Sequence, residues 1–253
     1  MKIKKIIKNI VYFLLNYFLF FRSYSNKAAI LMYHSVDINS LFFTVRLEEF
    51  AKQMAYLKNE KFNVISLSKL VEWIEKKQII PKKTVVLTFD DGYEDNCSNV
   101  LPILKRYNFP ATIFLVSGLI GQKAGDSQKI VLNMLTWMQI KEMYQSGLID
   151  FQPHSLTHKK LNRIDSVSAE QEIKGSKITI EEQLNKKCYL FSYPRGGFDE
   201  RIINILKKFK FRAGLSINKG FVSNNSNLFK LSRQSINSKT SFEEFKVKLK
   251  FNF

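Results

Sequence analysis

Short apolar runs alternate with amphipathic segments along most of this 253-residue chain, from Ala28 to Ser232. The apolar runs have the length of strands, and the segments between them carry apolar residues at helical spacing. About seven runs of this kind are present, and strands that alternate with helices favour a parallel sheet. The sequence therefore predicts an α/β fold, with its sheet either closed as a (β/α) barrel or open and doubly wound.

The predicted elements follow one another without an internal repeat or a Pro-rich linker, so residues 27–253 are expected to form a single domain. In the longest predicted helix, Val167–Leu184, the spacing of Glu and Lys residues indicates a solvated face. Gly118–Gln128 and Asn218–Asn227 are predicted to be exposed loops. The seven predicted strands are 28–33, 85–89, 111–116, 148–152, 188–193, 212–216 and 229–232. The other predicted helices are 47–57, 67–74, 100–107, 137–144 and 200–208.

The net charge of +18 invites comparison with nucleic-acid-binding proteins, because phosphates attract Lys and Arg. Of the 40 basic residues, however, only eight are Arg, the residue that most often reads bases and phosphates. A lysine-rich solvated surface explains the charge better, and no nucleic-acid partner is predicted. The two cysteines, Cys97 and Cys188, fit either a reducing or an oxidising compartment.

The first 26 residues form a separate segment in this interpretation. Four lysines among the first eight residues precede the apolar run Ile10–Phe21, a layout typical of export signals. Twelve helical residues reach about 18 Å, short of a bilayer core of roughly 30 Å. We expect residues 1–26 to be an uncleaved membrane anchor or an interfacial helix on an anionic membrane, with a cleaved signal or a core helix as alternatives.

Two adjacent carboxylates, Asp90 and Asp91, follow the buried run 85–89 and precede Gly92. Strand ends are where sites gather in α/β folds. Neighbouring like charges repel, so the pair is costly unless a cation or a proton-transfer task compensates it. The alternative is that Asp-Asp-Gly is only a turn, which these residue types also favour.

A second signal is the pair His154 and His158, two of the three histidines in the chain, just after a predicted strand. At this spacing a helical turn would present both imidazoles on one face, close enough for one metal ion. The alternative is a surface or core histidine pair. Because Asp90 and Asp91 lie at the end of another strand, one carboxylate can complete an Asp-His-His site with positions open for water and substrate.

Three motifs carry a family resemblance: TFDDG, HSLTH and SYPRG, in this order. Together they resemble the polysaccharide deacetylase family, the NodB-homology domain of carbohydrate esterase family 4. The stretches ILMYHSV and LSRQSI resemble its poly-N-acetylglucosamine deacetylase branch, and the likeness covers residues 28–236. It implies an irregular NodB-like (β/α) barrel of about seven parallel strands. It also implies a bacterial, metal-dependent hydrolase that removes N-acetyl groups from an amino sugar of a cell-envelope polysaccharide.

The resemblance assigns roles position by position. It implies Asp90 as the general base, Asp91, His154 and His158 as metal ligands, and the backbone N–H of Arg195 as a donor to the oxyanion. The metal is expected to be zinc, with cobalt or nickel as alternatives, because this ligand set suits several first-row ions.

The sequence departs from the commonest family pattern at two places. Ser192 stands where an arginine usually orients the base, and no histidine follows His158 to act as the acid. In the poly-N-acetylglucosamine branch the early Tyr-His motif implies His34 as that acid, and the alternative is a core histidine. Arg233 replaces the missing arginine or is an ordinary strand-end residue.

Tyr193, Pro194 and Arg233 are predicted to bind substrate, with a core position as the alternative for Tyr193. The predicted partner is an N-acetylated glycan, and the predicted location is the membrane or the cell envelope. Two other functions stay open: a metal-dependent amidase or esterase for a non-sugar acyl group, and a catalytically silent glycan-binding barrel.

Overall fold

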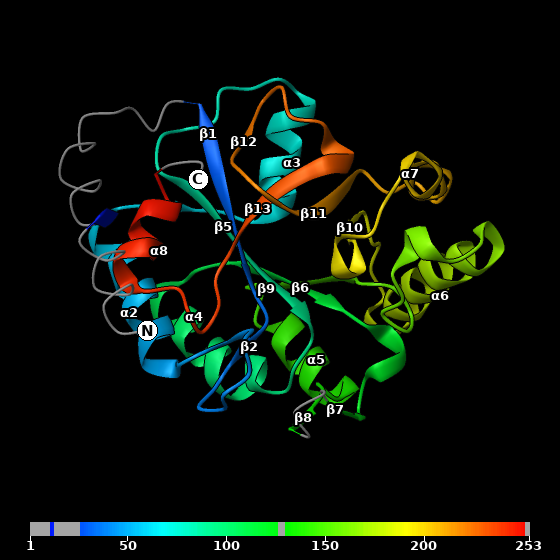
Figure 1. Ribbon diagram of the computed structural model, residues 1–253, viewed down its shortest axis with the longest axis horizontal. Coiled ribbons are helices and arrows are strands. Elements are labelled where there is room, and N and C mark those ends of the chain that lie inside the picture. The colour runs from blue at the N-terminus through cyan, green and yellow to red at the C-terminus, as the bar shows by residue number, and fades with distance from the viewer. Residues whose placement is uncertain (1–10, 13–25, 126–129, 251–253) are drawn as a thin grey trace.

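Seven parallel strands form the main path of the nine-stranded central sheet in the computed structural model of this chain, which describes residues 11–12, 26–125 and 130–250. Their order across the sheet is β10-β11-β13-β1-β5-β6-β9, and every neighbouring pair on this path is parallel (Figure 1). The prediction of about seven parallel strands is confirmed. The strands are β1 (Lys27–Tyr33), β5 (Thr84–Asp91), β6 (Ala111–Leu115), β9 (Ile149–Pro153), β10 (Leu190–Ser192), β11 (Ala213–Lys219) and β13 (Leu231–Ser235).

Side chains close most of the gap between the two edge strands, β9 and β10. Oε1 of Gln152 in β9 accepts hydrogen bonds from the backbone N–H groups of Tyr189 and Leu190, both at 3.0 Å. Nζ of Lys186 donates to the carbonyl oxygen of Phe151 at 2.6 Å. The sheet is therefore a nearly closed, irregular (β/α) barrel, and the open doubly wound alternative is wrong.

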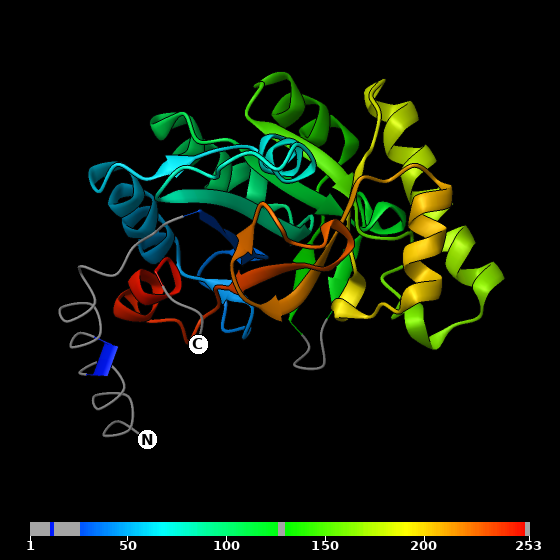
Figure 2. The same cartoon turned by 90° about the horizontal axis from the view of Figure 1, so that it is seen from above.

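Helices surround the strands (Figures 1 and 2). Several begin at a side-chain cap: Oγ of Ser66 accepts from the N–H of Lys69 at 3.2 Å, and the carboxylate of Asp199 accepts from the N–H of Ile202 at 2.9 Å. The helices are α2 (Leu47–Asn59), α3 (Leu67–Glu75), α4 (Leu101–Tyr107), α5 (Trp137–Gln145), α6 (Ser166–Leu184), α7 (Glu200–Lys208) and α8 (Phe242–Lys248).

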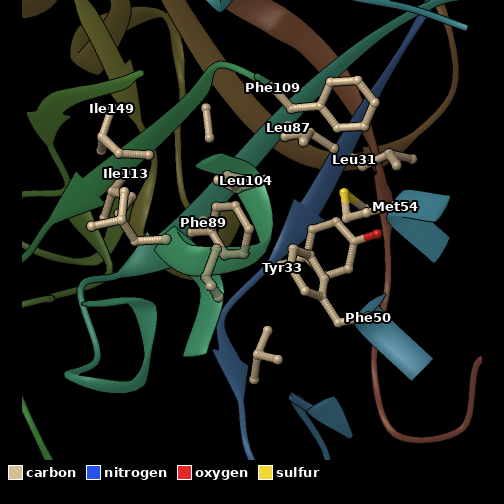
Figure 3. Close-up of a cluster of buried hydrophobic side chains, with 14 of the residues drawn as sticks. Leu31, Tyr33, Phe50, Met54, Leu87, Phe89, Leu104, Phe109, Ile113 and Ile149 are labelled. Atoms are coloured by element: carbon tan, nitrogen blue, oxygen red, sulfur yellow. The ribbon is translucent and has the colours of Figure 1, made fainter. Parts of the chain in front are cut away.

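Strand β5 divides its side chains between two faces, as the period of a strand requires. Leu87 and Phe89 pack outward against α2, where Phe89 stacks on Tyr33 at a centroid distance of 5.3 Å (Figure 3). Val86 packs with residues of β10, β11 and β13 inside the barrel. The same alternation directs Asp90 into the barrel interior, where it is buried.

Three predicted segments differ in detail. The loop at 118–128 contains one strand of an antiparallel hairpin, β7 (Lys123–Gly125) and β8 (Val131–Asn133), which the polar sequence of β7 does not indicate. The strand predicted at 229–232 starts at Leu231, because the Asn227 side chain caps a 3₁₀ turn at Leu228–Lys230. The loop at 218–227 loses its first two residues to β11 and contains β12 (Val222–Ser223).

The remaining short elements connect these parts. They are β2 (Ser35–Val36), β3 (Thr44–Val45), β4 (Asn63–Val64) and the helical turns Asn96–Val100, Ser117–Leu119, Leu161–Arg163 and Pro194–Gly196. The predicted N-terminal membrane-associating segment, 1–26, lies outside the described residues except at positions 11, 12 and 26. No helix within the described ranges has both the length and the apolar character that crossing a membrane requires.

Candidate active site

The two adjacent carboxylates end strand β5 and diverge there. Asp91 has a φ of 76° and Gly92 a φ of 84°, so the chain turns away immediately after Asp90. A Cβ atom on residue 92 would lie 2.6 Å from Cδ2 of Leu115, which adds a steric reason for glycine at this left-handed position. The turn lets Asp90 stay in the barrel interior while Asp91 reaches toward the loop after β9.

His154 and His158 meet Asp91 at this end of the barrel. Oδ1 of Asp91 lies 3.5 Å from Nε2 of His154 and 3.3 Å from Nε2 of His158. The three residues can each offer one ligand atom, and these atoms all lie within 4.8 Å of one another. This arrangement has the donor types and the spacing of a three-ligand metal centre.

The histidines do not share a helical face, so that part of the sequence prediction is wrong. The segment 154–158 is an irregular turn in which Ser155 and His158 have φ values of 67° and 62°. Left-handed residues cannot continue an α-helix. The two imidazoles are brought together by the turn instead, with ring centroids 5.0 Å apart.

The polar atoms of this cluster fit a divalent cation. Oδ1 of Asp91 is buried and has no hydrogen-bond donor among the described residues, a costly arrangement for a carboxylate oxygen without a cation. Nδ1 of His154 lies 2.8 Å from the carbonyl oxygen of Ser192 and can donate to it, which leaves Nε2 free to bind a metal. Burial lowers the pKa of His154 to about 4, so its imidazole is neutral near pH 7, as a ligand must be.

Asp90 is held by a guanidinium from across the barrel. Nη1 and Nη2 of Arg233 donate to its two carboxylate oxygens at 2.8 and 2.7 Å, and Oγ of Ser192 donates to Oδ2 at 3.2 Å. Burial by itself would raise the pKa of Asp90, but the charge and hydrogen bonds of Arg233 hold it well below its usual value. Asp90 is therefore a fixed, ionised carboxylate whose Oδ2 lies 4.0 Å from Nε2 of His154.

Arg233 contacts Asp90 in the way expected of the arginine that is absent at position 192. Its side chain is buried, so the prediction that it binds substrate is wrong, and the alternative of an arginine that orients Asp90 describes its contacts. Its Nη2 also donates to Oγ of Ser192 at 2.9 Å. A serine at 192 is small enough to admit the guanidinium from β13, which explains how the arginine comes from another strand.

Tyr193 and Pro194, which the sequence predicts to bind substrate, are both buried. Tyr193 is fully buried, its hydroxyl donates to the carbonyl oxygen of Phe229 at 2.9 Å, and its ring stacks on Phe198. Burial raises the pKa of the Tyr193 phenol well above its usual value. Pro194 is also buried. The core alternative for Tyr193 is the one that the packing supports.

Arg195 and His34 lie at the same end of the barrel as the carboxylates. Arg195 is the middle residue of the turn after β10 and has an exposed side chain and a φ of 53°. His34 follows β1 and is partly exposed, with its ring 5.8 Å from that of Phe43. Nδ2 of Asn96 donates to the carbonyl oxygen of His34 at 2.9 Å and so fixes the backbone at this position.

Two supporting contacts of the site were not predicted from the sequence. The carbonyl of Ser192 contacts His154, and the carboxylate of Glu172 accepts hydrogen bonds from the turn between the histidines. Glu172 is only 5% exposed, so it is an exception to the solvated face predicted from the Glu and Lys residues of this helix. Its position three residues after buried Ala169 and four before buried Ser176 is the signal that could have placed it on the inner face.

Comparisons with known proteins agree with this geometry. A family model described as polysaccharide deacetylase matches residues 77–214, which include Asp90 to Arg195 but end before Arg233. YxkH of Bacillus subtilis (strain 168) is 30% identical over 208 residues, 82% of this chain and 70% of that protein. The poly-beta-1,6-N-acetyl-D-glucosamine N-deacetylase of Staphylococcus aureus (strain MSSA476) is 30% identical over 202 residues, 76% of this chain and 67% of that one.

A solved structure extends the likeness to the fold. The deacetylase PplD of Streptococcus pyogenes, in complex with acetate, superposes with a TM-score of 0.79 at 28% sequence identity. The match covers 89% of this chain and 99% of that one.

Proposed function

Because this chain belongs to the polysaccharide deacetylase family, we propose that it is a metal-dependent hydrolase of N-acetyl groups on a cell-envelope polysaccharide. The observation that carries the proposal is the cluster of Asp91, His154 and His158 beside an ionised Asp90. The S. aureus relative, named for poly-beta-1,6-N-acetyl-D-glucosamine, supports an N-acetylated amino sugar as the substrate.

In this proposal Asp91, His154 and His158 hold the metal. A bound divalent ion would supply a Lewis acid that polarises the acetyl carbonyl and lowers the pKa of a neighbouring water molecule. Zinc is the first expectation, with cobalt or nickel as alternatives, because one carboxylate and two imidazoles suit several first-row ions.

Asp90 is proposed to accept a proton from the attacking water. Its carboxylate is fixed by hydrogen bonds from Arg233 and Ser192, so the orientation of its remaining lone pairs stays constant during the reaction. The backbone N–H of Arg195 is proposed to donate to the oxyanion that forms on the acetyl carbon. His34 is proposed to deliver a proton to the departing amine, the task for which an imidazole is suited near neutral pH.

A substrate panel tests this function. Oligomers of β-1,6-linked N-acetylglucosamine, chitooligosaccharides and a simple aryl acetate are incubated with the protein, with and without a chelator, and followed by mass spectrometry. We expect acetyl loss from at least one of the two glycans, and we expect chelator to abolish it. Turnover of the aryl acetate with both glycans untouched would favour the amidase or esterase alternative. No turnover and no zinc binding would favour the silent glycan-binding barrel.

We also propose that the enzyme works at the membrane or in the cell envelope. The basic start and apolar run of residues 1–26 support this location. Sedimentation of the full chain with anionic vesicles, but not with zwitterionic vesicles, is the expected result. Equal binding to both kinds of vesicle would indicate that the apolar run binds the membrane without help from the basic residues. Binding to neither kind would refute membrane association.

A further inference from the structure

A buried carboxylate on helix α6 contacts the turn that carries the two histidines. Oε2 of Glu172 accepts hydrogen bonds from the backbone N–H groups of Leu156 and Thr157, at 3.0 and 2.7 Å. Its Oε1 accepts from the hydroxyl of Thr157. No ion pair to Glu172 occurs within the described part of the chain, so these donors compensate the burial of its charge.

The turn is held from its other side as well. The N–H of Ser117 donates to the carbonyl oxygen of Ser155 at 3.2 Å, and the N–H of Gly118 donates to that of Leu156 at 2.8 Å. The N–H of His154 donates to the carbonyl oxygen of Leu115 at 2.8 Å. Two carbonyl groups of the turn are thus bound by the residues after β6, whereas two of its N–H groups depend on Glu172.

This turn needs such support because its backbone is not regular. Ser155 and His158 both have left-handed φ values, which cost free energy in non-glycine residues. Oγ of Ser155 accepts from the N–H of His158 at 2.9 Å, which closes the turn locally. Glu172 fixes the two residues between them, and thereby sets where the His158 ring lies relative to Asp91.

We propose that Glu172 is a positioning residue for the metal centre: its carboxylate holds the Ser155–His158 turn so that His158 is preorganised as a ligand. This inference rests on the metal-binding role proposed above for Asp91, His154 and His158. Outer groups that orient metal ligands typically change metal affinity by about 10–100-fold when they are removed. An equal loss of stability with and without metal would be expected if Glu172 served the fold alone.

Three variants test the proposal with zinc alone as the probe. Glu172→Leu removes all acceptors for the turn at similar size. Glu172→Gln keeps an acceptor for the N–H groups and an amide that can donate to Oγ of Thr157. Glu170→Gln is the matched control, because Glu170 lies on the same helix, is paired with Lys208 on the surface and forms no hydrogen bond with the described residues of the turn.

Zinc dissociation constants are measured by chelator competition, well below the melting temperature of each metal-free variant. We expect Glu172→Leu to bind zinc about 10–100-fold more weakly than the wild type, Glu172→Gln to fall between them, and Glu170→Gln to match the wild type. The rise in melting temperature on adding zinc should shrink in the same order. At saturating cobalt, the visible absorption of Glu172→Leu should differ from that of the wild type.

A folded Glu172→Leu protein with wild-type zinc affinity and cobalt spectrum would overturn the proposal. Where Glu172→Leu does not fold, Thr157→Val decides, because it removes only the hydroxyl that donates to Oε1. Weaker zinc binding by Thr157→Val supports the role of Glu172, and unchanged binding contradicts it. Zinc binding without glycan deacetylation would refute the proposed function and leave this inference standing.

Discussion

Replacing Arg233 by methionine (Arg233→Met) is expected to lower the free energy of unfolding by about 3–5 kcal/mol, the usual cost of breaking a buried ion pair. The side chain is fully buried and donates to both oxygens of Asp90, to Ser192 and, through Nε, to the carbonyl oxygen of Ser216 at 2.9 Å. Methionine fills similar space but leaves the Asp90 carboxylate buried without its cation. For a chain of this size the melting temperature should fall by roughly 6–20 °C.

Urea unfolding of the protein in chelator, near pH 7, measures this effect without a bound metal. Arg212→Met is the matched control, because Arg212 pairs with Glu75 on the surface, where such pairs contribute about 0–1 kcal/mol. In the double variant Asp90→Asn with Arg233→Met the unpaired charge is absent, so part of the lost stability should return. A loss below about 1 kcal/mol for Arg233→Met, or strictly additive effects in the double variant, would refute the reasoning.

Three further changes separate the roles of neighbouring residues. His34→Ala should lower turnover by about 10²- to 10⁴-fold with unchanged zinc affinity, and near-normal turnover would exclude it as the acid. Tyr193→Phe should lower the free energy of unfolding by about 1 kcal/mol through loss of the hydrogen bond to Phe229, and should leave the KM for glycan unchanged. A raised KM would indicate that Tyr193 contacts the substrate. Burial raises the pKa of Asp95 to about 6 from 3.8, so folding favours its neutral form and stability falls as pH rises from about 4 to about 6. In urea unfolding, the free energy of unfolding of Asp95→Asn relative to that of the wild type should therefore rise by up to about 3 kcal/mol between pH 4 and pH 8. A difference between the two proteins that does not change with pH would contradict this.

The local pattern of the sequence was enough for most of the barrel. Helix α7 has the predicted bounds, Glu200–Lys208, because a capping aspartate and a strong apolar stripe both mark it. The start of β13 was displaced by two residues, since Phe229 and Lys230 belong to a capped turn that apolar content does not reveal. Closure of the sheet depends on Gln152 and Lys186, whose partners lie more than thirty residues away in the chain. Local periodicity carries no information about such contacts.

The candidate site, like the fold, was predicted from the sequence only in part. Residue types and motif order were enough to single out Asp91, His154 and His158, which the structure brings within ligand distance of one another. The supporting groups were harder to predict, because Arg233 lies 143 residues from Asp90 and Glu172 acts on backbone N–H groups. The helical geometry assumed for the histidines failed because spacing alone does not report a left-handed turn.

Zinc reconstitution of the metal-free protein tests the central claim most directly. Acetate release from oligomers of β-1,6-linked N-acetylglucosamine is measured as zinc is added, for the wild type and for Asp91→Asn. We predict that release is absent without metal, rises to a plateau near one zinc ion per chain, and stays absent in Asp91→Asn. Equal release by the chelated protein, or full activity of Asp91→Asn, would contradict a metal-dependent deacetylase built on Asp91, His154 and His158.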